Sequence, residues 1–147
     1  MSFKKKVQYW FPAFLWISFI FWMSTGAFSA ENTYLFIGPF LRFLLPSIST
    51  KEIVVFHAIL RKLAHLTEYF ISGLLLFRAF REGSDKRREW LWAASSLLIV
   101  VIIAAGDEIH QSFVPTRTAA SVDVGLDITG GLLAQGVSVL MFRRQRQ

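Results

Sequence analysis

Four apolar stretches, each close to the length of a bilayer-crossing helix, dominate the sequence. A transmembrane helix needs about 20 mostly apolar residues, and the stretches cover residues 7–27, 63–80, 90–112 and 122–142. Hydrophobic residues make up 54% of the 147 residues, and charged residues only 18%. A chain of this length cannot bury so much apolar surface in a water-soluble core. We therefore expect an all-α integral membrane protein, a four-helix bundle that forms a single domain over residues 1–147.

The basic residues predict which side of the membrane each end of the chain faces. The chain has 16 Lys and Arg against 10 Asp and Glu, a net charge of +6. Three clusters flank the predicted spans: Lys4, Lys5 and Lys6; Arg78, Arg81, Lys86, Arg87 and Arg88; Arg143, Arg144 and Arg146. With four spans all three clusters fall on one side, and basic loops favour the cytoplasm. We expect a multi-pass protein of the bacterial cytoplasmic membrane with both termini cytoplasmic.

These features allow two other interpretations. The first 29 residues could form a cleaved signal peptide, although their apolar run is longer and more aromatic than is usual. The basic tracts lack the interleaved aromatic residues or groove-reading motif of a nucleic-acid site, so we expect no nucleic-acid partner. The chain has no cysteine, which excludes disulfides and thiolate metal sites.

The segment between the first two spans is not a simple loop. Residues 34–45 are apolar but too short to cross a bilayer, which predicts a short interfacial or re-entrant segment. Ser49 and Glu52 then have the spacing of a capping box, in which a hydroxyl and a carboxylate satisfy the first helical N–H groups. The second long helix is therefore predicted to begin near Thr50, outside the bilayer.

Polar side chains recur at helical spacing on three of the predicted helices. Intervals of three and four residues keep side chains on one face. The second helix carries His57, Arg61, His65, Glu68 and Ser72. The fourth carries Asp123, Asp127, Gly130 and Ala134. The outer end of the third carries Asp107, His110 and Gln111, and Arg117 follows in the next loop.

These polar stripes fall at one depth, in the outer half of the membrane. Ionisable side chains inside a membrane are costly and normally face the bundle interior or a wet cavity. The sequence therefore predicts an outward-facing polar pocket, and the small residues below Asp127 would let a neighbouring helix approach closely. The alternative is a buried polar network that only fixes the register of the helices.

Two segments of the chain resemble the VanZ-like family. The first contains Lys62, His65, Glu68, Tyr69, Phe70, Gly73, Arg78 and Ala79. The second contains Asp107, Glu108, His110, Gln111, Phe113, Pro115, Arg117, Ser121, Asp123, Val124 and Gly130. The resemblance covers about residues 10–142 and implies a small bacterial multi-helix membrane protein. The namesake of the family is associated with resistance to the glycopeptide teicoplanin. Asp127 is a departure, because members often carry Asn at that place.

The position of the pocket predicts recognition or modification of an anionic lipid or a lipid-linked envelope precursor. Cationic side chains would meet its phosphate, and Arg can do so with a bidentate fork. The expected binding residues are Arg61, Lys62, Arg117, Gln111, Asp123 and Asp127. No cofactor is expected, the partner would be a membrane lipid or lipid-linked wall precursor, and a homo-oligomer stays open. A link to teicoplanin-type resistance rests on the resemblance alone.

Three alternatives to simple binding remain open, and the sequence does not decide whether the protein is an enzyme. An intramembrane hydrolase or transferase could use Glu68, Asp107, His65 and His110 as acid or base, with Ser72, Ser112 or Thr116 as nucleophile. The same four acid and histidine residues form two pairs spaced three apart, a pattern that can hold a divalent metal ion. Chains of acids and histidines also mark proton paths, as in a proton-coupled lipid transporter.

Overall fold

The computed structural model describes residues 2–84, 87–116 and 121–145, and these residues form helices without a single strand. The elements in chain order are α1 (Phe3–Met23), the short 3₁₀ turn η1 (Gly26–Phe28), α2 (Ala30–Leu44), α3 (Thr50–Arg81), α4 (Glu89–Ser112) and α5 (Ser121–Arg144). The all-α prediction is confirmed for this part of the chain. The described chain has five α-helices where we expected four, because the segment between the first two predicted spans is itself a helix.

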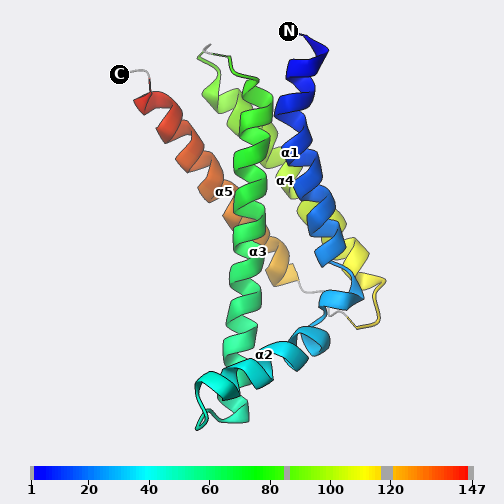
Figure 1. Cartoon of the computed structure of the whole chain (residues 1–147). Coiled ribbons are helices and arrows are strands. Elements are labelled where there is room, and N and C mark those ends of the chain that lie inside the picture. Colours follow the sequence, from blue (N-terminus) through cyan, green and yellow to red (C-terminus); the bar gives the residue numbers. More distant parts are fainter. Residues whose placement is uncertain (1, 85–86, 117–120, 146–147) are drawn as a thin grey trace.

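The long helix α3 is the centre of the fold. It has 32 residues, roughly 48 Å at 1.5 Å per residue, and helices α1, α4 and α5 all pack against it (Figure 1). Its first third extends beyond the ends of those three helices, and α2 lies across that extension. The start of α1, the end of α5 and the end of α3 lie together at the opposite end of the molecule.

Both ends of α3 are fixed by local capping. The Ser49 side chain accepts from the backbone N–H of Glu52 at 3.3 Å, and the Glu52 carboxylate accepts from the backbone N–H of Ser49 at 2.8 Å. This confirms the capping box and the predicted start of the helix at Thr50. The backbone hydrogen bond with Ser49 holds the pKa of Glu52 below its usual value. At the other end Glu82 and Gly83 have φ of 49° and 72°, the left-handed turn that ends many helices.

A sharp corner separates α1 from α2. The axis of α1 and that of residues 26–44 are bent by 69°. The Ser29 side chain caps α2 by accepting from the Asn32 N–H at 3.3 Å, and the Asn32 amide donates to the Gly26 carbonyl at 2.8 Å. With 15 residues α2 is too short to cross a bilayer alone. The segment that we predicted to be interfacial or re-entrant is thus a helix of its own, joined to α1 by a hydrogen-bonded corner.

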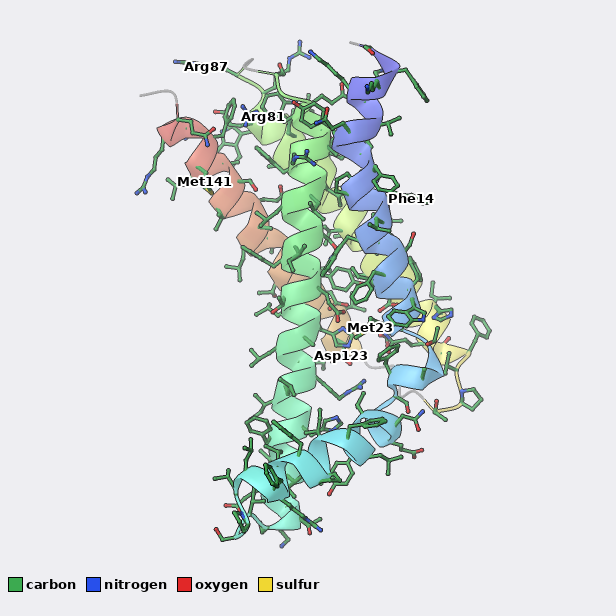
Figure 2. The ribbon with its side chains drawn as sticks, viewed as in Figure 1. Phe14, Met23, Arg81, Arg87, Asp123 and Met141 are labelled. Carbon is green, nitrogen blue, oxygen red and sulfur yellow. The ribbon has the colours of Figure 1, made fainter. Side chains whose placement is uncertain are left out.

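Two helices of the described chain meet the length and hydropathy of a membrane span by themselves. They are Glu89–Ser112 and Val122–Arg144, and the bent pair of α1 with residues 26–44 would add a third. The polar face of α3 lowers its hydropathy, so the expected four spans are supported only in part. Large apolar side chains are nevertheless exposed on the outer faces, among them Phe14, which is 71% exposed and points away from the other helices (Figure 2). Such a surface suits contact with lipid.

Glycines bring α3 and α5 into close contact. A Cβ added at Gly130 would collide with the backbone carbonyl oxygen of Leu66, and one added at Gly73 would lie 2.6 Å from the Ala134 Cβ. The Gln135 amide also donates to the Gly73 carbonyl at 3.3 Å. The small residues predicted below Asp127 therefore do allow the close approach expected of them. This packing holds the polar faces of the two helices against each other.

Replacing Gly130 should separate these helices. We expect Gly130→Ala to lower the stability of the protein by roughly 1–3 kcal/mol, because the added methyl group meets the rigid backbone of α3. Gly136→Ala is the matched control, since nothing lies within 4 Å of a Cβ at that position, and Ala favours a helix over Gly. Thermal unfolding in detergent would compare the two. Equal melting temperatures for both variants would contradict the close contact.

Candidate functional site

A cavity of about 180 Å³ lies where the corner between α1 and α2 meets α3 and α4. Its wall is mostly apolar, with a small number of ionisable and hydrogen-bonding side chains. The lining residues are Ile20, Met23, Ser24, Phe28, Thr33, Ile37, His57, Leu60, Arg61, Ala64, His65, Glu68, Asp107 and Gln111. A concave apolar site with a few polar groups is the usual form of a small-ligand pocket.

Helix α3 presents its predicted polar face to this cavity. His57, Arg61, His65 and Glu68 all line it, as their spacing of four, four and three residues requires on one face of a helix. Lys62, which we expected among the binding residues, is exposed and does not line the cavity. One step along the helix is a turn of about 100°, enough to carry that side chain to another face.

Arg61 is held at the cavity wall by the corner between α1 and α2. Its guanidinium donates to the backbone carbonyl of Phe28 at 3.0 Å. Asp123 and Glu68 lie close enough to interact with its charge. Asp123 does not line the cavity; Figure 2 shows it at the start of α5, at the level of Met23. The carboxylate of Asp123 therefore acts on the cation from outside the cavity.

Helix α5 contacts His65 through Asp127, a residue outside the cavity. The Nδ1 of His65 lies 3.2 Å from Oδ1 of Asp127, and the two side chains are 12% and 3% exposed. This contact with the Asp127 carboxylate holds the imidazole ring in one orientation, with its other nitrogen, Nε2, facing away from α5. Asp127, which we expected among the binding residues, thus contacts a histidine and does not line the cavity.

Asp107 brings a buried carboxylate to the cavity from α4. The Gln111 side-chain amide donates to its Oδ2 at 2.8 Å, and both residues are 3% exposed. Within the described residues, Asp107 Oδ1 has no hydrogen-bond partner. A buried acceptor without a partner is costly. The Gln111 amide therefore orients the carboxylate through Oδ2, while the buried Oδ1 has no polar partner among the described residues.

The sequence interpretation missed the contribution of α1 and α2. The Ser24 hydroxyl and His110 Nδ1 are 3.1 Å apart, and Thr33 Oγ1 and His57 Nε2 are 2.9 Å apart. The Trp16 indole also donates to the Glu68 carbonyl at 2.9 Å. His110 itself does not line the cavity but reaches it through Ser24. The polar break at residues 24–26 and the cap at Ser29 were the available signals for this corner.

The remaining candidates are not gathered in the cavity. Ser72 donates to the Glu68 carbonyl and Ser112 to the Ile109 carbonyl, so both hydroxyls are engaged by backbone. Thr116 does not line the cavity either, and Arg117 lies outside the described residues. No group of three His, Asp or Glu side chains in the described part of the chain is placed to hold a metal ion. The geometry therefore gives no support to the metal alternative.

Comparison with known proteins identifies one family. The sequence model described as VanZ/LLP1 matches residues 9–142. Among curated proteins and among solved structures, no significant match is found. The matched range contains all the residues that line the cavity, together with Asp123 and Asp127 on α5.

Removing only His65 from its pair with Asp127 should cost more stability than changing both residues. We expect His65→Leu to destabilise the protein by about 3 kcal/mol, because it leaves a buried carboxylate without its partner. Adding Asp127→Asn should recover much of this loss, since the amide carries no charge. Thermal unfolding of the two variants and the parent in detergent measures the effect. A double variant no more stable than His65→Leu would show that Asp127 has another partner.

Proposed function

Because the chain belongs to the VanZ/LLP1 family, we propose that it is a multi-pass protein of the bacterial cytoplasmic membrane that recognises an anionic envelope lipid or lipid-linked envelope precursor. The start of α1 and the ends of α3 and α5 lie at one end of the molecule (Figure 1). The basic residues concentrate there, which favours a cytoplasmic location for that end. The cavity, near the other ends of α1, α4 and α5, then opens toward the outer leaflet.

The observation that carries the proposal is the arginine in an otherwise mostly apolar cavity. A guanidinium is costly inside a membrane unless it is partnered or functional. Arg61 has a carbonyl acceptor at Phe28, yet its side chain still lines the cavity. The planar guanidinium has five N–H donors, so one carbonyl leaves capacity for a phosphate. His57 and His65 line the same wall and would add donors when protonated.

The size of the cavity indicates which part of a lipid it would take. At about 180 Å³ it is smaller than the 300–1,000 Å³ of pockets that enclose whole drug-sized ligands. A headgroup phosphate with its first substituent fits this scale, whereas acyl or prenyl chains would stay in the bilayer. The Asp107 carboxylate, which lines the same cavity, would accept a hydrogen bond from a hydroxyl or amine of that substituent. Handling a lipid-linked wall precursor would also suit a role in teicoplanin-type resistance, which rests on the family resemblance.

Arg61 should contribute strongly to the affinity of the protein for an anionic lipid. We expect native mass spectrometry of the parent, with phosphatidylglycerol supplied in the detergent, to show a bound lipid that Arg61→Ala weakens by roughly tenfold, the scale of a lost charge-assisted hydrogen bond. Lys62→Ala is the matched control, because it removes the same charge from the next residue without touching the cavity. Equal losses in both variants would reduce the effect to general surface charge and defeat the proposal.

A second candidate function is an intramembrane hydrolase or transferase. It is favoured by the contact of Ser24 with His110, because a hydroxyl within hydrogen-bond reach of an imidazole is the arrangement that activates a nucleophile. The Ser24 oxygen would attack the carbonyl carbon of a lipid ester as its proton passes to His110 Nδ1. The leaving alcohol would depart with that proton, and water would then hydrolyse the acyl-serine. Arg61, on the same cavity, is the available cation for the developing oxyanion.

A fluorophosphonate probe tests this second function directly. If Ser24 is an activated nucleophile, the probe should label the parent at that residue, and both Ser24→Ala and His110→Leu should abolish the label. Ser112→Ala is the control, because its hydroxyl is bonded to a backbone carbonyl and should not matter. Peptide mass spectrometry would locate the adduct. A folded, lipid-binding parent that takes no label would leave the recognition function standing and remove the enzymatic one.

A further inference from the structure

An apolar groove lies between α4 and α5, toward the end of the molecule away from the cavity that contains Arg61. Its volume is about 650 Å³, within the roughly 300–1,000 Å³ of ligand pockets. Apolar side chains form most of its wall, among them Ala93, Leu97 and Leu132. Gly136 also lines the groove and deepens it, because nothing lies within 4 Å of a Cβ placed there. The groove is therefore a hollow in the surface and not only another exposed apolar face.

The length of the groove matches one leaflet of a bilayer. Its lining residues on α5 run from Leu132 to Arg143, roughly 16 Å along the helix axis. The hydrocarbon core of a bilayer is about 30 Å thick, and one leaflet contributes half of it. Trp90 lies at the same end of the groove as Arg143 and is 66% exposed, as is typical of an indole at the headgroup level. The groove thus extends from the headgroups of one leaflet to about the middle of the membrane.

The end of the groove at the headgroup level is basic. The Arg143 Nε donates to the Glu89 carboxylate at 3.2 Å, and the guanidinium lies 5.2 Å from the centre of the Trp90 ring. Arg144 is the last residue of α5, and Arg88 directly precedes α4. Three arginines therefore stand against one glutamate at the ends of these two helices. The charge that remains after the ion pair is positive, whichever N–H groups of Arg143 are engaged.

We propose that this groove holds an acyl chain of an anionic phospholipid in the cytoplasmic leaflet, with the headgroup near Arg143 and Arg144. The inference rests on the topology in the proposed function and not on the ligand of the Arg61 cavity. A flexible hydrocarbon chain fits an apolar groove one leaflet long, and a positive charge at its end attracts an anionic headgroup. A second copy of the chain fits less well, because a two-fold contact through the groove would bring the arginines of both copies together.

Photolabelling in vesicles tests the groove directly. The full chain would be reconstituted in phosphatidylcholine with a small fraction of phosphatidylglycerol whose acyl chain carries a diazirine, and peptide mass spectrometry would locate the adducts. We expect adducts concentrated on residues 93–97 and 132–140 rather than on α1, where Phe14 is also open to lipid. A phosphatidylcholine probe with the same acyl chain should label the groove roughly fivefold less, the preference that about one basic residue gives an anionic lipid.

Variants of two glycines on α5 separate the groove from the rest of the surface. Gly136→Leu should reduce the labelling of the groove several-fold, because the new side chain begins in open space inside it. Gly125→Leu is the matched control, since nothing lies within 4 Å of a Cβ there either, but the position is outside the groove. It should leave the labelling unchanged. Arg88→Gln with Arg144→Gln should remove the preference for phosphatidylglycerol while the phosphatidylcholine probe still labels the groove.

Three results would overturn the proposal. Adducts spread evenly over the outer faces would show only ordinary contact with the bilayer, and equal labelling by the two probes would remove the role of the anionic headgroup. The chain has no cysteine, so Gly136→Cys introduces a single thiol, and efficient disulfide-linked dimers on oxidation in vesicles would assign the groove to a second copy. Arg61→Ala should not change the adducts in the groove, so a failure of the Arg61 cavity to bind lipid would leave this result intact.

Discussion

The cost of placing charged and polar groups inside an apolar medium organises this molecule. Three ionisable side chains on the inner face of α3 each meet a partner from a different element: the Phe28 carbonyl for Arg61, Thr33 for His57 and Asp127 for His65. Unpartnered, each of these groups would be expensive in a membrane. Meeting that need draws the corner of α1 and α2, and also α5, onto a single helix. The polar face of α3 thus lines the candidate site and also contributes to the packing around it.

Periodicity within one helix was readable from the sequence. The spacing of His57, Arg61, His65 and Glu68 fixed their common face, and the cap at Ser49 located the start of α3, because both depend only on neighbours within one or two turns. The role of Gly130 followed from its place below Asp127. These features depend on the geometry within one helix and not on how that helix packs against others.

Contacts between segments that are far apart in the sequence could not be predicted from residue spacing. Ser24 and His110 are 86 positions apart, and Trp16 and Glu68 are 52 apart, so no spacing rule connects them. Helical phase separates Arg61, which lies on the polar face, from Lys62, which lies about 100° away around the helix, so the expectation that Lys62 also binds rested on its charge and not on its position. Spacing within one helix does not give the role of Asp127 either, because that role depends on which residue of α3 faces it. Hydropathy does not identify α3 as a candidate span in the described chain, because its polar face is averaged with its apolar one.

Because the corner between α1 and α2 forms part of the cavity wall, cleavage of the chain at this corner would alter the cavity. Its residues Met23, Ser24 and Phe28 form one wall of the cavity, and Phe28 supplies the carbonyl that holds Arg61. A peptidase that cut the chain at this corner, as at the end of a secretory leader, would remove α1 and open that wall. The guanidinium of Arg61 would then lose its backbone acceptor at Phe28. Proteolytic processing at this point is therefore incompatible with an intact wall of this cavity.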